Sequence, residues 1–260
     1  MPTEVLYEQH GPIGRITFST PSGINILSTP VVKALEARLD EIAEHPEIRV
    51  VILTGSGKTF LAGADISEMS GASTSGGQAF SQRGQAGLNR LASFEHAVTI
   101  AAINGAALGG GCELALACDL RVIASDAKIG LPEVRLGLLP GWGGTQRALA
   151  LLGPARAKRL VFSGAPINGQ LAAEIGLVNE VVPVSELMVT AEMLAKQVLE
   201  CGPMAVRFAK RAMCEAEAAR LEKGLFAEAV AFGEIFGGDE AREGLKAFLE
   251  KRKPTWAAAR

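Results

Sequence analysis

Two glycine-rich segments, each carrying one glutamate, contain the residues of this sequence best suited to chemistry. Residues 102–113 end in GGGCE, and the last residue is Glu113. Residues 129–147 contain Glu133 and, further on, Gly143-Gly144. A carboxyl group can transfer a proton, and backbone amides at the start of a helix can stabilise a negatively charged oxygen. Two carboxyl groups beside such amides would suit proton transfer next to a carbonyl group.

The first segment is predicted to be the end of a strand, 98–103, followed by a helix over 109–117. Glycine permits a ligand to approach the backbone because no Cβ is in the way. The first N–H groups of a helix have no partner within it and can donate to an oxyanion. Glu113 would lie in the first turn of this helix, near the same ligand.

The second segment places Glu133 among apolar residues, and a helix is predicted to begin after Gly143-Gly144. Burial would raise the pKa of Glu133, so that it could donate a proton near neutral pH. A structural interpretation stays open beside the catalytic one, because glycine-rich helix starts are common and a glutamate in a first turn can simply complement the helix dipole.

Other motifs fail. Gly55 to Thr59 resembles a phosphate loop, but Ile52 stands where that loop needs a glycine, so a polar turn is expected. Neither glycine run fits a dinucleotide fingerprint, and Gln146 takes the place of the last glycine in the second. The sequence has no G-x-S-x-G elbow. The three histidines, His10, His45 and His96, lie outside the glycine-rich segments, which argues against a histidine-dependent nucleophile or a metal site.

Composition restricts the partners. The 260 residues are 48% hydrophobic and 21% charged, with 26 basic and 28 acidic residues, so neither nucleic acid nor an anionic membrane is an expected partner. No cysteine pair has Cys-x-x-Cys spacing, and reduced, mostly buried thiols are expected for Cys112, Cys118, Cys201 and Cys214. The start of the chain lacks the features of a secretory signal, and its longest apolar stretch, 97–108, is too short to span a bilayer. We expect a cytoplasmic protein.

Strands and helices alternate along the first part of the chain, which predicts an α/β fold. A strand pair is expected at 4–9 and 13–18, then a helix at 31–44 after a cap at Ser28 and a first-turn Pro30, then a buried strand at 50–54. A helix at 78–95 should follow a mobile Gly/Ser-rich loop at 70–77. Further strands are expected at 120–124 and 178–182. From 185 onward the pattern is helical, so the chain divides into a core over 1–190 and a helical region over 191–260.

Several long motifs resemble the enoyl-CoA hydratase/isomerase, or crotonase, family. The resemblance covers roughly residues 5 to 256. The motifs, in order, are P-x-x-x-N-x-L at 21–27, AGAD-I-x-E-M at 62–69, NG-xAxGGGxE at 104–113, PE-xxLG-xxPG-xGGTQR at 132–147 and SG-x-x-x-x-A-x-x-x-GLV at 163–178.

The resemblance implies a crotonase-like spiral of repeated β-β-α units, with a C-terminal helical region for trimerisation and pocket closure. The amides of Ala64 and Gly110 would form an oxyanion hole for a thioester carbonyl. Glu113 would activate the attacking water and Glu133 would deliver a proton to C2. Gly141 matches a residue near the site.

The family also implies where coenzyme A would bind. The backbone at Ala62, Ala64, Asp65 and Ile66 would hold its adenine and pantetheine arm. Two family lysines are replaced here, by Ser22 and Ser67. Phosphate contacts are then expected from Lys251, Arg252 and Lys253 near the C-terminus, with a solvated basic tail as the alternative. No cofactor or metal is required, because coenzyme A is part of the substrate.

The predicted function is reversible addition of water to 2-trans-enoyl-CoA, giving 3-hydroxyacyl-CoA, as in fatty acid β-oxidation. The first alternative is enoyl-CoA isomerisation, which one carboxylate can perform, or another reaction of the crotonase family. A noncatalytic RNA- or partner-binding protein is the alternative of another class, but the helix at 31–49 is acidic. The family forms trimers that pair into hexamers, and we expect the same assembly here.

Overall fold

The computed structural model describes residues 2–65, 68 and 73–256, and it repeats one unit of two strands and a helix. The strands are β1 (Glu4–His10), β2 (Ile13–Ser19), β3 (Val50–Gly55), β4 (Thr59–Leu61), β5 (Val98–Ile103), β6 (Ala106–Leu108), β7 (Leu120–Ala124), β8 (Lys128–Gly130), β9 (Ile167–Asn168) and β10 (Glu180–Val182). The helices are α1 (Thr29–Ala43), α2 (Thr74–Ala92), α3 (Gly110–Ala117), α4 (Gly144–Ser163), α5 (Gly169–Glu174), α6 (Leu187–Leu199), α7 (Pro203–Phe236) and α8 (Asp239–Leu249), with short 3-10 helices η2 (Glu133–Leu136) and η3 (Val184–Glu186).

The strands form two sheets. The larger sheet has the order β1-β2-β3-β5-β7-β10, and all its pairs are parallel except the hairpin β1-β2. The smaller sheet has the order β4-β6-β8-β9, parallel except for β8-β9. Strands β3 and β5 lie in the middle of the larger sheet and are almost wholly buried, as their continuous apolar sequences predict.

Three successive units, β3-β4-α2, β5-β6-α3 and β7-β8-η2-α4, each give their first strand to the larger sheet and their second strand to the smaller one. The predicted α/β class and the repeated β-β-α spiral are therefore confirmed. The second strands are only three residues long, and the sequence patterns did not predict them.

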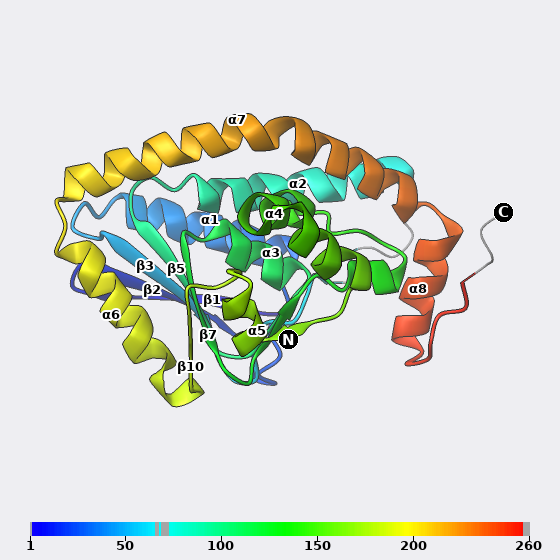
Figure 1. Ribbon diagram of the computed structural model, residues 1–260, viewed down its shortest axis with the longest axis horizontal. Coiled ribbons are helices and arrows are strands. Elements are labelled where there is room, and N and C mark those ends of the chain that lie inside the picture. The colour runs from blue at the N-terminus through cyan, green and yellow to red at the C-terminus, as the bar shows by residue number, and fades with distance from the viewer. Residues whose placement is uncertain (1, 66–67, 69–72, 257–260) are drawn as a thin grey trace.

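The C-terminal helices cover this core. Helix α7 runs along the top of the molecule over α2, while α6 packs against the larger sheet and α8 stands at the opposite end beside η2 (Figure 1). The main hydrophobic core includes Phe232 and Phe236 of α7 and Ala241 of α8. None of the helices in the described ranges is long and apolar enough to cross a membrane.

Two local predictions need correction. Ser28 occupies the N-cap position of α1, but its side chain makes no capping hydrogen bond. The carboxylate of Glu68 instead accepts from the Thr29 N–H at 3.1 Å and from the Thr29 hydroxyl at 2.7 Å. Helix α2 begins at Thr74 rather than at residue 78, because Ser73 caps it by accepting from the Gly76 N–H at 3.3 Å. The predicted mobile loop is thus partly helix, and its residues 70–72 lie outside the described part of the chain.

Candidate active site

A cavity of about 530 Å³ opens where the second strands of three units end. Strands β4, β6 and β8 are parallel neighbours, so their carboxyl ends meet at one edge of the smaller sheet. Ala64, Gly110 and Glu133 each follow one of these strands by two or three residues. The cavity wall contains all of the described residues that the sequence assigned to the site except Lys251: Ala62, Ala64, Asp65, Gly110, Glu113, Glu133 and Gly141.

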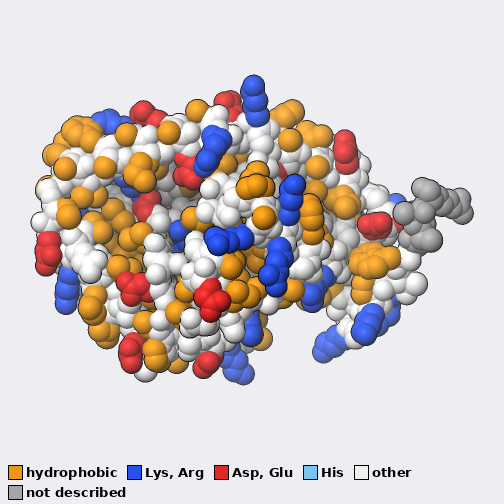
Figure 2. All heavy atoms as spheres, in the orientation of Figure 1, with side chains coloured by type: hydrophobic (Ala, Val, Ile, Leu, Met, Phe, Trp, Pro, Cys, Tyr) orange, Lys and Arg blue, Asp and Glu red, His pale blue; other side chains and the backbone are white. Residues whose placement is uncertain are grey.

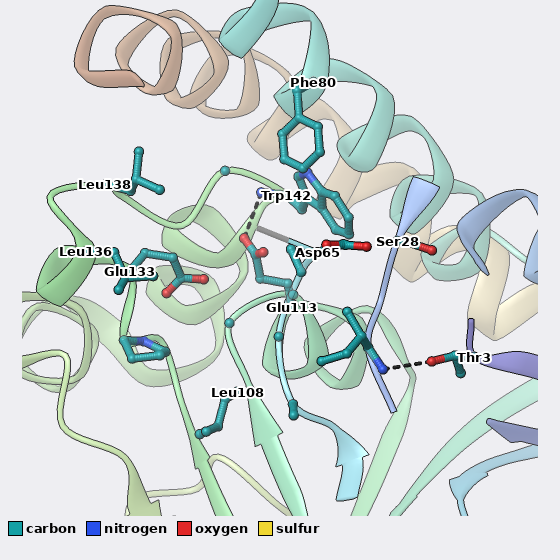
Figure 3. Close-up of a pocket in the computed structure, with 18 of the residues that line it drawn as sticks. Thr3, Ser28, Asp65, Phe80, Leu108, Glu113, Glu133, Leu136, Leu138 and Trp142 are labelled. Carbon is teal, nitrogen blue, oxygen red and sulfur yellow. Dashed lines mark hydrogen bonds between the residues drawn. The ribbon is translucent and has the colours of Figure 1, made fainter. Parts of the chain in front are cut away.

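Glu113 is held by the start of the next helix. It lies in the first turn of α3, as predicted, and its side chain is buried (2% exposed). Its Oε1 accepts from the backbone N–H of Trp142 at 2.7 Å (Figure 3). It also accepts from the N–H of Gly144 at 2.9 Å. These amides belong to the turn that opens α4 and have no partner inside that helix. One carboxylate oxygen is therefore fixed, and the other can face the cavity.

Glu133 opens η2, directly after β8 and Leu131-Pro132. Its Oε2 is buried and has no hydrogen-bond partner in the described part of the chain. Gly109 lies against it, since a Cβ built on Gly109 would be 3.0 Å from Glu133 Oε1. Gly109 also has a φ of 53°, so both its conformation and its surroundings favour glycine. Figure 3 shows the Glu113 and Glu133 carboxyl groups in the same part of the cavity.

Burial perturbs both carboxyl groups. It raises the pKa of Glu113 well above its ordinary value, and repulsion by Glu133 adds to the effect. Burial also raises the pKa of Glu133, to about 8. The pair therefore favours retaining a proton near neutral pH. The two amides that donate to Glu113 favour its ionised form. Only its own backbone N–H lowers the pKa of Glu133, and its Oε2 has no partner in the described part of the chain. We accordingly place the negative charge on Glu113 and the proton on Glu133.

The amides of Ala64 and Gly110 lie close together on the cavity wall. A Cβ built on Gly110 would be 3.5 Å from the Ala64 nitrogen and 3.4 Å from the Trp142 ring. Gly110 is the first residue of α3, so its N–H has no partner within the helix. Within the described residues, neither N–H donates to another group. Two such N–H groups beside a carboxylic acid and a carboxylate can stabilise an oxyanion while a proton is transferred.

The other predicted residues are less central. Gly141 lines the cavity ahead of α4, and its carbonyl accepts from the Ser81 hydroxyl. Lys251 is exposed beyond the end of α8 and is not part of the cavity wall. Ile66 lies outside the described residues. The prediction that Ile66 and Lys251 bind coenzyme A therefore stays a prediction.

Sequence reasoning missed several residues of the site. Phe80, Trp142 and Phe232 form an aromatic wall, with ring centroids 5.3 Å apart for Phe80 and Trp142 and 6.1 Å apart for Phe80 and Phe232. Glu228 of α7 was missed as well. The sequence does contain an indication of its role, because Glu228 is a charged residue on the apolar face of the helix, between Leu225 and Phe232.

The fold and the site together place two backbone N–H groups beside two buried carboxyl groups, an arrangement that suits an enzyme acting through an oxyanion. The sequence model of the enoyl-CoA hydratase/isomerase family matches residues 8–259. Short-chain-enoyl-CoA hydratase of Clostridium acetobutylicum is 42% identical over 250 residues, which cover 96% of this chain and 95% of that protein. Crotonyl-CoA hydratase of Syntrophomonas wolfei is 40% identical over 250 residues, 96% of each. The structure of carnitinyl-CoA hydratase from Mycobacterium avium matches with a TM-score of 0.85 at 36% identity, covering 97% of both chains. The chain belongs to the enoyl-CoA hydratase/isomerase, or crotonase, family.

Proposed function

We propose that this protein is an enoyl-CoA hydratase, a hydro-lyase that adds water reversibly to 2-trans-enoyl-CoA and gives 3-hydroxyacyl-CoA. The observation that carries the proposal is the pair Glu113 and Glu133 beside the free amides of Ala64 and Gly110. Relatives at about 40% identity over nearly the whole chain carry hydratase names. A place in fatty acid β-oxidation fits this reaction.

In the proposed mechanism, the thioester oxygen accepts hydrogen bonds from the Ala64 and Gly110 N–H groups. Glu113, as the carboxylate, takes a proton from water while the water oxygen bonds to C3. The C2–C3 π electrons move onto the thioester as an enolate, which the two amides stabilise. Glu133, as the acid, delivers its proton to C2. One water molecule has then been added, and Glu113 carries the proton that Glu133 has lost.

Coenzyme A would enter along Ala62, Ala64 and Asp65, while the acyl chain would extend towards the aromatic wall of Phe80, Trp142 and Phe232. No additional cofactor is needed for this chemistry, because the thioester itself accepts the electrons. A cytoplasmic location is part of the proposal. The four cysteines are free thiols in the structure, as a reducing compartment would leave them, although only Cys112 and Cys118 are buried.

A homotrimer, or a hexamer of two trimers, is also proposed. Large hydrophobic side chains are exposed on α4, α7 and α8, among them Phe162 (73% exposed), Met213 (72%) and Leu249 (68%). Figure 2 shows α8 projecting from the body of the molecule with hydrophobic side chains on its surface. Burial of these side chains between subunits would be favourable. Light scattering coupled to size exclusion should give three or six times the mass of the 27.1 kDa chain, and a monomer would refute this part.

The test of the function is the loss of enoyl-thioester absorbance when the purified protein is mixed with crotonyl-CoA, with Glu133→Gln as the control. Rapid loss in the wild type alone is expected. The second candidate, isomerisation of 3-enoyl-CoA, is favoured by the family description and by the ability of one carboxylate to move a proton. An increase in that absorbance from a 3-enoyl-CoA, without loss from crotonyl-CoA, would establish the isomerase instead.

A further inference from the structure

A third buried glutamate lies behind the active site. Glu228 belongs to α7, is 4% exposed and lies on the same helix face as Leu225 and Phe232. A buried carboxylate is costly unless its oxygens accept hydrogen bonds. The partners of Glu228 therefore indicate what this residue does.

Both oxygens of Glu228 are used. Oε1 accepts from the Gly143 N–H at 2.6 Å and from Gln85 Nε2 at 3.1 Å. Oε2 accepts from the Thr145 N–H at 3.0 Å and from the Thr145 hydroxyl. The carboxylate thus joins α7 to α2 and to the turn that opens α4.

The bonds alternate along that turn. Trp142 and Gly144 donate their N–H groups to Glu113, and Gly143 and Thr145 donate theirs to Glu228. Successive amides therefore point to two different carboxylates on opposite sides of one segment. The side that faces Glu113 cannot turn without breaking the bonds to Glu228.

We propose that Glu228 is a positioning residue for the reaction: it holds the Gly143 and Thr145 amides so that those of Trp142 and Gly144 stay directed at Glu113. The inference rests on the proposed hydratase function for its kinetic consequence, but not for its geometry. It also makes the C-terminal helix α7 a part of the catalytic centre, although Glu228 does not touch the substrate.

We expect Glu228 to act through its charge as well: burial raises its pKa, but the hydrogen bonds from Thr145, Gln85 and Gly143 favour its ionised form. The titratable groups that face it are Glu113 from α3, Glu133 from η2 and Arg147 from α4. Repulsion by Glu228 raises the pKa of both Glu113 and Glu133. Removal of the Glu228 charge should therefore lower the pKa values of Glu113 and Glu133, while the positive charge of Arg147 remains nearby. A bell-shaped dependence of kcat on pH would then move to lower pH at both limbs.

The decisive variant is Glu228→Gln, which keeps the size of the side chain and removes its charge. Glu234→Gln is the matched control, because Glu234 is an exposed glutamate on the same helix. With crotonyl-CoA, we expect kcat of Glu228→Gln to fall on the order of 100-fold, as small displacements of catalytic groups do, with KM within about threefold of the wild-type value. Both limbs of the pH profile should shift to lower pH, and Glu234→Gln should behave as the wild type. Thr145→Val, which removes one bond to Glu228, should show a smaller loss of kcat and serves if Glu228→Gln does not fold.

Hydrogen–deuterium exchange of the peptide covering residues 141–147 provides a readout without substrate. Exchange in this peptide should be faster by on the order of tenfold in Glu228→Gln than in Glu234→Gln. Unchanged exchange would overturn the proposal, because Glu228 would then not hold this turn. A loss of kcat with both limbs of the pH profile unmoved would also overturn it, because a purely structural role of Glu228 would leave the pKa values of Glu113 and Glu133 unchanged. If the wild type does not hydrate crotonyl-CoA, the proposed function fails, and the exchange measurement alone decides whether Glu228 positions this turn.

Discussion

Replacement of Glu113 by glutamine should separate catalysis from stability. Glutamine keeps the side-chain length and an oxygen that can accept the Trp142 and Gly144 N–H groups, now at 2.7 and 2.9 Å from Glu113 Oε1. It cannot take a proton from water. The variant should therefore retain the geometry of the site and lose only the base.

The sizes of the two effects follow from these contacts. General base catalysis contributes roughly 100- to 10,000-fold, so kcat of Glu113→Gln should fall within that range. Its free energy of unfolding near pH 7 should be unchanged or higher, because a buried charge that Glu228 repels is removed. Glu113→Ala should instead leave two buried N–H groups without a partner. At roughly 1–3 kcal/mol for each group, the free energy of unfolding should fall by about 2–6 kcal/mol.

The assay combines the decrease in enoyl-thioester absorbance with urea unfolding of wild type, Glu113→Gln and Glu113→Ala. Glu234→Gln, exposed on α7, serves as the control for a change of charge. Turnover of Glu113→Gln close to that of the wild type would refute its role as the base. Equal stability of the Gln and Ala variants would refute the contribution of the two backbone hydrogen bonds.

Two other predictions concern the acid and the oxyanion hole. The folded-state pKa of Glu133 is raised to about 8, so its protonated form contributes stability at low pH that is lost as the pH rises towards and through 8. The free energy of unfolding of the wild type should thus fall between about pH 5 and pH 9, relative to Glu133→Gln, by about 4 kcal/mol. Parallel pH curves of the two proteins in urea unfolding would contradict the raised pKa. Gly110→Pro removes one of the two donors at a helix position where proline is tolerated. We expect kcat to fall roughly 100- to 1000-fold, more than affinity for a saturated acyl-CoA, and a loss confined to binding would place the oxyanion elsewhere.

Much of the site could be predicted because its residues are concentrated in short motifs. Residues 102–113 contain a strand end, a helix start and a glutamate in the first turn, and the structure shows all three. The helix after Gly143-Gly144 was predicted for the same local reasons and begins at Gly144. These features depend on glycine, on apolar runs and on position within a few residues, all of which are visible in one sequence.

The features that were missed depend on partners distant in the chain. Strands β4, β6 and β8 are three residues long, too short for an alternating pattern, and exist because they pair with one another. The cap of α1 comes from Glu68, about 40 residues beyond the helix start. In the sequence, Glu228 is a charged residue on an otherwise apolar helix face. Its role becomes visible only from its hydrogen bonds to Gly143 and Thr145 at the start of α4. Composition alone also misjudged the start of α2, because the glycines and serines of 73–77 fit a helix whose first turn is capped by Ser73.

The missed strands explain why the proposed catalytic groups lie together. In three successive units the chain leaves the larger sheet, forms a short second strand and ends at the same edge of the smaller sheet. From those ends come the Ala64 amide, the Gly110 amide and the Glu133 carboxyl group, and parallel pairing places them side by side. The repeat therefore supplies both proposed oxyanion donors and the proposed acid in the same way, from the end of a second strand. Glu113 instead requires the helix start of the next unit. A Cβ on Gly144 would lie 2.8 Å from Glu113 Oε1, so this contact works only where the backbone itself approaches the carboxylate. Because these contacts are made by the backbone, the proposed chemistry depends on glycine-rich segments rather than on histidines.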